Sequence, residues 1–197
     1  MSTPDAATAH AIIIRQVLAG DVNAFAWIVD RYHARCLRVA THLLGDEDEA
    51  DDAVQDAFLR AYRHLGSYRP GDNGRCQPGH QSGDKFGAWI LRIVVNQCRT
   101  RSRRMARFTR LDTEPSAFHS DMSAASDHDA AERRTDLAQA LALLGPEQRE
   151  AVVLRFADEL SYDEMASITG VGVSALKMRV QRACTRLRAL LAEHLHA

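Results

Sequence analysis

The side chains with the clearest capacity for chemistry lie near the end of the chain, where cations and short polar residues alternate on a helical pattern. Leu176, Val180, Ala183, Leu187 and Leu190 recur at the spacing of one helix face, which must be the buried face. No acidic residue occurs between residues 174 and 192. Cations neutralise phosphates, and short polar side chains reach the edges of bases, so this helix is predicted to read DNA. The residues opposite and beside the buried stripe are Ser174, Lys177, Met178, Gln181, Arg182, Thr185, Arg186 and Arg188.

The residues before this helix predict how it is presented. Ser161 is a candidate N-cap, and Glu164 three residues later completes a capping box for a short helix over 162–168. Gly170 suits a left-handed turn, and the next helix is expected to begin with Ser174 as its cap. The predicted arrangement is a helix, a tight glycine turn and a second helix. This helix-turn-helix arrangement places its second helix in the major groove of DNA. The alternative is a solvated amphipathic helix in an ordinary bundle, and the capped helix with its glycine turn favours DNA binding.

Two blocks of like charge occur in the first half of the chain. The acidic block is predicted to dock a basic or polar protein partner, and the basic block to bind nucleic acid. A helix N-terminus that favours carboxylates explains residues 46–49, but not Asp52 and Asp56, which lie a turn or more further in. The acidic block is Asp46, Glu47, Asp48, Glu49, Asp51, Asp52 and Asp56, and the basic block is Lys85, Arg92, Arg99, Arg101, Arg103, Arg104, Arg107 and Arg110.

Aromatic side chains accompany the basic block. Trp89 and Asn96 lie on the same predicted helix, and Tyr68 lies before the stretch 70–84. Aromatic rings beside cations suit unstacked single-stranded bases, which offer flat faces for stacking. Core packing is the favoured role for Trp89, so Tyr68 is the better candidate for a base contact.

Helical periodicity is frequent and strand signals are nearly absent, which predicts an all-α fold. Helices are expected over 21–44, 48–65 and 85–104, with glycines at 45 and 66 as stops, and the turn-forming stretch 70–84 is expected to be a loop. Two small helical domains are therefore predicted, over 10–110 and 135–197, joined by an acidic linker over 111–134. The second domain is expected to break at 145–146, 160–161 and 169–170.

The composition and the absence of several motifs narrow the classes of protein to which the chain could belong. The chain has 197 residues and a net charge of -1, with four scattered cysteines and no CxxC pair, so a reducing cytosol fits better than a disulfide framework. No signal peptide and no run of roughly 18 to 20 apolar residues occurs, so we expect a soluble, cytoplasmic protein that contacts no membrane. No phosphate loop, HExxH or GxSxG motif occurs, so neither an enzyme nor a cofactor is expected. A zinc site is disfavoured because Cys76 with His80, and His33 with Cys36, lack two further ligands.

Several stretches resemble a known family. The stretch 48–58 (DEADDAVQDAF) resembles region 2 of the sigma-70 family, and 87–96 (GAWILRIVVN) resembles the promoter-melting helix that follows it. The stretches 144–149 (LGPEQR), 160–166 (LSYDEMA) and 170–183 (GVGVSALKMRVQRA) resemble region 4. Both regions occur in order, as in the extracytoplasmic-function (ECF) group, which keeps only these two. The resemblance implies an alternative RNA polymerase sigma factor of a stress response, which directs promoter-specific initiation while the polymerase performs catalysis.

The same resemblance implies partners and residue roles. The partners would be promoter DNA, the β′ clamp helices and β flap of core RNA polymerase, and, by analogy, an anti-sigma factor. The linker 111–134 would enter the template and RNA channel. Polymerase docking would fall to Asp48, Asp52, Gln55 and Asp56, and minus-10 contacts to Tyr68, Arg92, Asn96, Arg99, Arg101 and Arg103 with the loop before Lys85. Minus-35 contacts would fall to Ser174, Lys177, Met178, Arg179, Gln181 and Arg182, although Arg179 falls nearer the buried stripe and suits a phosphate contact or an internal brace.

Three departures from the family pattern and one rival function accompany this prediction. The loop 70–84 is long for the group, Gly172 replaces the usual proline, and Cys184 lies where a base is common. The rival is a dimeric helix-turn-helix regulator that binds operators. Such a regulator needs a dimerisation surface or an effector pocket, and the sequence shows no segment for either.

Overall fold

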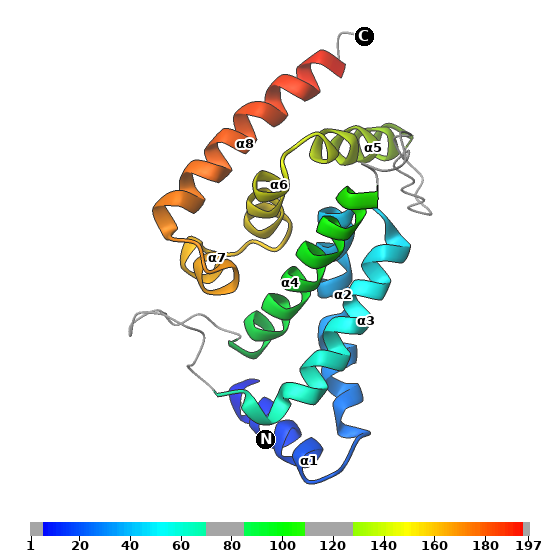
Figure 1. Ribbon diagram of the computed structural model, residues 1–197, viewed down its shortest axis with the longest axis vertical. Helices are drawn as coiled ribbons and strands as arrows, with labels where there is room; N and C mark the ends of the chain where they lie inside the picture. Colours follow the sequence, from blue (N-terminus) through cyan, green and yellow to red (C-terminus); the bar gives the residue numbers. More distant parts are fainter. Residues whose placement is uncertain (1–5, 70–84, 109–127, 195–197) are drawn as a thin grey trace.

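The computed structural model describes residues 6–69, 85–108 and 128–194. Within these ranges the chain forms helices joined by turns and no strand, which confirms the predicted all-α class. Helices α1–α4 fill the lower half of Figure 1 and α5–α8 the upper half, with α4 running along the boundary. The first group is α1 (Ala6–Leu18), α2 (Ala24–Leu44), α3 (Glu47–His64), the short 3-10 turn η1 (Leu65–Ser67) and α4 (Lys85–Phe108). The second group is α5 (His128–Ala142), α6 (Pro146–Val152), the π-helical turn η2 (Val153–Ala157), α7 (Tyr162–Thr169) and α8 (Val173–His194).

The boundary between α2 and α3 follows from two adjacent residues. Gly45 adopts a left-handed conformation (φ 76°) and donates its N–H to the carbonyl of Thr41, which closes α2. The Asp46 side chain then accepts a 2.8 Å hydrogen bond from the Glu49 N–H and caps α3. The two helices therefore reverse direction within two residues, as the glycine predicted.

The first core lies between α2, α3 and α4. Apolar residues at three- and four-residue spacings place Ile28, Val39, Val54, Ile90 and Val94 at no more than 1% exposure. Burial of each such side chain contributes about 1.5–3 kcal/mol. This packing fixes which side of α4 can face outward.

The helix-turn-helix has the predicted capping box and turn, with one correction. Ser161 and Glu164 bond each other's backbone N–H groups at the start of α7, and Gly170 ends α7 with φ 74°. The prediction that Ser174 caps α8 is wrong, because α8 begins at Val173 and Ser174 lies inside its first turn. The Leu176 N–H bonds the carbonyl of Gly172, which makes Gly172 the residue that flanks the helix.

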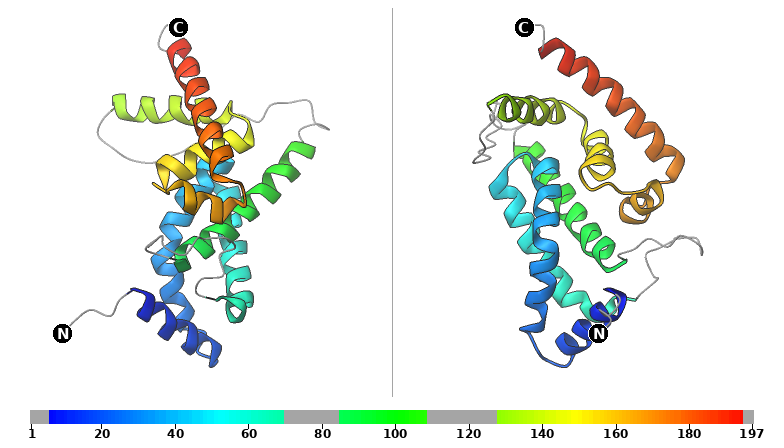
Figure 2. Two further views of the ribbon diagram at one scale, coloured as in Figure 1. Left: turned by 90° about the vertical axis from the view of Figure 1, so that its left-hand side faces the viewer. Right: turned by 180° about the vertical axis from the view of Figure 1, so that it is seen from behind.

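The two helical groups share a continuous apolar core. Leu154, Met165, Ile168 and Leu176 of the second group are at most 2% exposed and belong to the same buried cluster as the residues of α2–α4. Figure 2 shows α6 and α7 beside α4 in both views.

The last part of the predicted linker 111–134 is helical, because α5 begins at His128. None of the helices in the described ranges is both long and apolar enough to cross a membrane.

Candidate nucleic-acid interface

The outer face of α8 carries several cations. Leu176, Val180, Ala183 and Leu187 are buried as predicted, which turns the opposite face of the helix to solvent. Within the described part of the chain, no carboxylate forms an ion pair with any cation of this outer face. The cations of this face can therefore meet phosphates without first breaking an ion pair to a described carboxylate. Its exposed residues are Ser174, Lys177, Met178, Gln181, Arg182, Thr185, Arg186 and Arg188.

Two contacts orient the start of α8. The Lys177 ammonium lies 5.7 Å from the centre of the Tyr162 ring, and the Arg155 guanidinium lies 5.3 Å from the same ring. Arg179 is half-buried and pairs with Glu147 of α6 at 2.8 Å. Arg179 therefore braces α8 against α6 in this structure, one of the two roles that the sequence left open for it.

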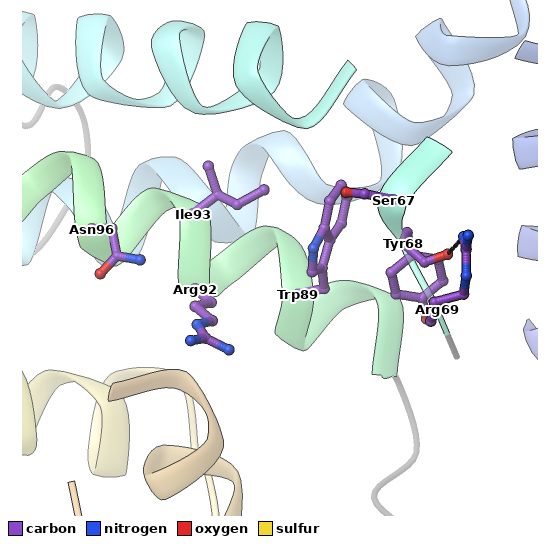
Figure 3. Close-up of a pocket in the computed structure, with 7 residues that line it drawn as sticks. All are labelled: Ser67, Tyr68, Arg69, Trp89, Arg92, Ile93 and Asn96. Carbon is purple, nitrogen blue, oxygen red and sulfur yellow. Dashed lines mark hydrogen bonds between the residues drawn. The ribbon is translucent and has the colours of Figure 1, made fainter. Parts of the chain in front are cut away.

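A hollow of about 230 Å³ lies between the end of η1 and the outer side of α4 (Figure 3). Drug-sized ligands occupy roughly 300–1,000 Å³, so the hollow suits a smaller flat group such as one base. The rings of Tyr68 and Trp89 lie 5.2 Å apart at one end, and Arg92 and Asn96 follow along α4. The residues that line it are Ser67, Tyr68, Arg69, Trp89, Arg92, Ile93 and Asn96.

The hollow combines residues that the sequence assigned to different roles. Tyr68 and Asn96 meet there beside Arg92, as joint minus-10 contacts require. Trp89 packs against the core and also lines the hollow, so its ring serves both packing and the surface. Ser67, Arg69 and Ile93 were not predicted as site residues. Their positions in the sequence could have identified them, because Ser67 and Arg69 flank Tyr68 and Ile93 lies one helical turn from Trp89.

Arg101 lies among the carboxylates of the acidic block. Its guanidinium bonds Glu49 at 2.8 Å, Asp56 at 2.8 Å and Asp52 at 3.3 Å. Burial lowers the pKa of Arg101, but the bonds to Glu49 and Asp56 outweigh it and raise the pKa above its ordinary value. Arg101 is thus a permanent cation that joins α4 to α3, a role that the sequence analysis did not predict.

Arg99 points to the second helical group. Its Nε and Nη2 bond the two carboxylate oxygens of Glu150 at 2.6 and 2.7 Å, and its Nη2 lies 3.5 Å from the carbonyl of Thr169 in α7. The hydrogen bond to Glu150 raises the pKa of Arg99 against the opposing effect of burial. By contrast, Arg92 and Arg103 are exposed and pair with no carboxylate of the described residues.

The acidic block has an exposed edge on α3. Asp48, Asp52, Gln55 and Asp56 all face solvent. The Gln55 amide donates a 3.0 Å hydrogen bond to Asp51. Leu59, one turn further along α3, is 55% exposed and places an apolar side chain beside these polar ones. An edge of this composition suits docking to another protein.

The described cysteines have no sign of metal ligation. Cys36 and Cys98 are buried, and burial raises the pKa of each thiol to about 12. Such thiols stay protonated near neutral pH and are poor metal ligands. Among the described residues no group of three His, Cys, Asp or Glu side chains could hold an ion. Cys76 and His80, like the rest of the loop 70–84, lie outside the described residues.

Comparison with known proteins gives the family. The model of sigma-70 region 2 matches residues 28–76, and the model of sigma-70 region 4 matches residues 134–187. The ECF RNA polymerase sigma factor SigW of Bacillus subtilis is 32% identical over 185 residues, which cover 89% of this chain and 92% of SigW. The ECF RNA polymerase sigma factor SigM of Mycobacterium tuberculosis is 34% identical over 175 residues, which cover 88% of this chain and 80% of SigM.

Two solved structures agree in fold. The sigma factor RpoE of Bartonella quintana, bound to the anti-sigma factor NepR, has a TM-score of 0.66 and 27% identity, and the match covers 87% of this chain and 98% of RpoE. CnrH, in complex with the cytosolic domain of CnrY, has a TM-score of 0.63 and 28% identity, and the match covers 94% of this chain and 98% of CnrH. These matches favour a sigma factor over an operator-binding dimeric regulator. The chain belongs to the ECF sigma factors of the sigma-70 family, which direct RNA polymerase to promoter DNA for transcription initiation.

Proposed function

We propose that this sigma factor divides promoter recognition between α8 and the hollow on α4. The observation that carries the proposal is the outer face of α8, where cations flank short polar side chains and meet no carboxylate of the described residues. Lys177 and Arg182 would hold phosphates, while Ser174, Met178 and Gln181 would reach base edges of the minus-35 element. Arg179 would support the helix from behind, through its ion pair with Glu147.

The hollow would capture one unpaired base of the minus-10 element. Stacking on an aromatic ring contributes about 1–3 kcal/mol per base, which offsets part of the unpairing cost of a few kcal/mol. Tyr68 and Trp89 offer the rings, and Asn96 offers hydrogen-bonding groups. Of the α4 arginines predicted to contact the minus-10 element, Arg92 and Arg103 are exposed and pair with no described carboxylate, so they would meet the backbone. Phosphate contacts by Arg99 and Arg101 remain predictions that require their ion pairs to open.

The exposed edge of α3 would dock the β′ clamp helices of the polymerase, through Asp48, Asp52, Gln55 and Asp56. The second helical group would meet the β flap, and the linker 111–134 would enter the polymerase channel; most of that linker lies outside the described residues. An anti-sigma factor is a further proposed partner, because RpoE and CnrH were solved in complexes, RpoE with an anti-sigma factor. The factor would catalyse no reaction itself and would act with the polymerase in the cytoplasm.

Run-off transcription with core polymerase, with and without this chain, tests the proposal. Start-site-specific RNA is expected only when the chain is present. The Gln181→Ala variant should alter minus-35 preference by about 1–3 kcal/mol if Gln181 contacts a base. Ala189→Gln, an exposed change further along α8, is the matched control and should leave the preference unchanged. Equal transcription by the unmutated chain from intact and scrambled minus-35 promoters would contradict the proposal.

A charge change on α3 tests the docking edge. Asp48 is the sharper target than Asp52 or Asp56, because those two also bond Arg101 and their reversal would disturb the α3–α4 contact. We expect Asp48→Lys with Gln55→Ala to weaken co-purification with core polymerase while the far-UV circular dichroism stays unchanged. Asp30→Lys, an exposed acid on α2, is the control. Undiminished co-purification of the α3 variant would rule this edge out.

A further inference from the structure

Two bidentate ion pairs join the two helical groups. Arg35 of α2 bonds both carboxylate oxygens of Asp158 at 2.7 Å each, and Arg99 of α4 bonds both oxygens of Glu150 at 2.6 and 2.7 Å. Arg38 lies 3.7 Å from the same Asp158. The Asp158 and Glu150 side chains are only 2% and 8% exposed. Carboxylates this buried require a paired cation, and each finds it in the other group.

Asp158 lies in a turn whose backbone is strained. Glu159 has φ 54°, a left-handed conformation that disfavours residues other than glycine, and it is the one such residue in the described ranges. The N–H groups of Asp158 and Leu160 bond the carbonyls of Val153 and Leu154, which hold the turn in place. Strain of this kind persists where the surroundings over-determine it and often marks a functional element. Here the strained turn directs a carboxylate at the arginines of α2.

Contacts other than ion pairs continue the same interface. The Arg149 guanidinium donates a hydrogen bond to the carbonyl of Leu43, at the end of α2, and α7 packs against α4. In Figure 1 α7 lies beside α4. The first helix of the helix-turn-helix therefore covers part of the helix proposed to bind the minus-10 element.

This arrangement is incompatible with simultaneous promoter contacts. The minus-10 and minus-35 elements are roughly 25 base pairs apart, which at about 3.4 Å per pair is roughly 85 Å along the duplex. The start of α8 and the middle of α4 lie on either side of α7, whose Thr169 carbonyl is 3.5 Å from Arg99. The connecting stretch 109–127 does not prevent separation, because a chain of about twenty residues can span up to roughly 65 Å.

We propose that the Arg35–Asp158 and Arg99–Glu150 pairs form an interdomain latch that holds the free sigma factor closed. Glu150 bonds the Arg99 guanidinium as a DNA phosphate would. The closed form therefore competes with nucleic acid for this arginine. Polymerase and promoter DNA select the open form, in which α4 and α8 separate and Arg99 is released. The competition with nucleic acid rests on the proposed minus-10 role of α4, whereas the latch itself does not.

Small-angle X-ray scattering of the full chain tests the latch without DNA. The double variant Asp158→Asn with Glu150→Gln keeps the shapes of both side chains and removes both charges. We expect its radius of gyration in low salt to exceed that of the unmutated chain by several ångströms, and the unmutated chain to expand in high salt, where ion pairs are screened. Glu147→Gln is the matched control, because Glu147 is also on α6 but pairs within its own helical group. A double variant as compact as the unmutated chain would overturn the latch.

A second variant covers the case in which the first loses helical structure. Arg35→Gln with Arg38→Gln changes two side chains that are 27% and 53% exposed, and leaves Asp158 without its cations. This variant should expand in the same way. A compact Arg35/Arg38 variant of normal helix content would overturn the contribution of the Arg35–Asp158 pair to the latch.

Fluorescence anisotropy with a labelled single-stranded oligonucleotide tests the competition. Because affinity scales with the fraction of molecules in the binding-competent form, the open variants should bind at least about fivefold more tightly than the unmutated chain. Expansion with tighter binding supports both parts of the inference. Expansion without tighter binding supports the latch and overturns the assignment of the α4 surface to nucleic acid.

Discussion

The helices α4 and α8 are alike in sequence and differ in what their cations do. Both are long, both bury one apolar stripe, and both carry several arginines on the remaining surface. On α4, Arg99 and Arg101 are held by carboxylates from α6 and α3. On α8, the exposed arginines pair with no carboxylate of the described residues. The number of cations on a helix therefore does not say how many are available to a ligand, because availability depends on the acids that other elements bring.

The largest expected effect tests the similarity of the two buried stripes. Ile90 of α4 and Leu176 of α8 are each 1% exposed, so Ile90→Ala and Leu176→Ala should each lower the free energy of unfolding by about 2–5 kcal/mol. Urea denaturation followed by circular dichroism measures this. Met178→Ala, at a side chain 51% exposed, should change stability by less than about 0.5 kcal/mol. A loss below about 1 kcal/mol for only one of the two core variants would show that the stripes are not equivalent.

A smaller effect tests the difference between the outer faces. Arg101→Gln removes the cation shared by three carboxylates, and we expect a loss of about 1–2 kcal/mol that shrinks at high salt, since those carboxylates are largely solvated. Arg182→Gln, on the open face of α8, should stay within about 0.5 kcal/mol. The same urea titration, run at low and high ionic strength, gives both numbers. Equal losses for the two variants would remove the distinction drawn between the helices.

The smallest effect separates a phosphate contact from a brace. Arg182→Gln should reduce the slope of log affinity against log salt concentration by about one unit for promoter DNA bound by the polymerase complex. We expect a much smaller change for Arg101→Gln, because three carboxylates of its own domain hold that guanidinium. A full unit lost by Arg101→Gln would instead identify Arg101 as a phosphate contact of the initiation complex.

Local sequence signals predicted most of the elements, although the first helix, α1 over Ala6–Leu18, was not predicted. The glycines at 45 and 170, the capping box of Ser161 and Glu164, and the apolar stripe of α8 all depend on contacts within a few residues, so the pattern along the chain suffices. The cap of α8 was the exception. Serine usually favours a cap, but the turn through Gly170 allows the helix to begin one residue before Ser174.

The long-range ion pairs could not be predicted from local sequence patterns. Arg35 and Asp158 are 123 residues apart, and Arg99 and Glu150 are 51 apart. Nothing in the pattern around a surface-like arginine says which distant carboxylate it will meet, because that depends on how whole helices pack. The hollow was predictable only in part. The sequence indicated that Tyr68 and Asn96 act together, but they lie close in space only because η1 ends beside α4.

The sequence by itself determined most of the helices, their buried stripes, the helix-turn-helix and the family, because each rests on spacing or on short motifs. Only the tertiary structure decided which arginines pair with carboxylates of the described residues, and only it placed α7 over part of α4. The physical reason is that hydrophobic periodicity is a local property of the chain. The partner of a charged side chain is instead set by the packing of elements that are remote in sequence.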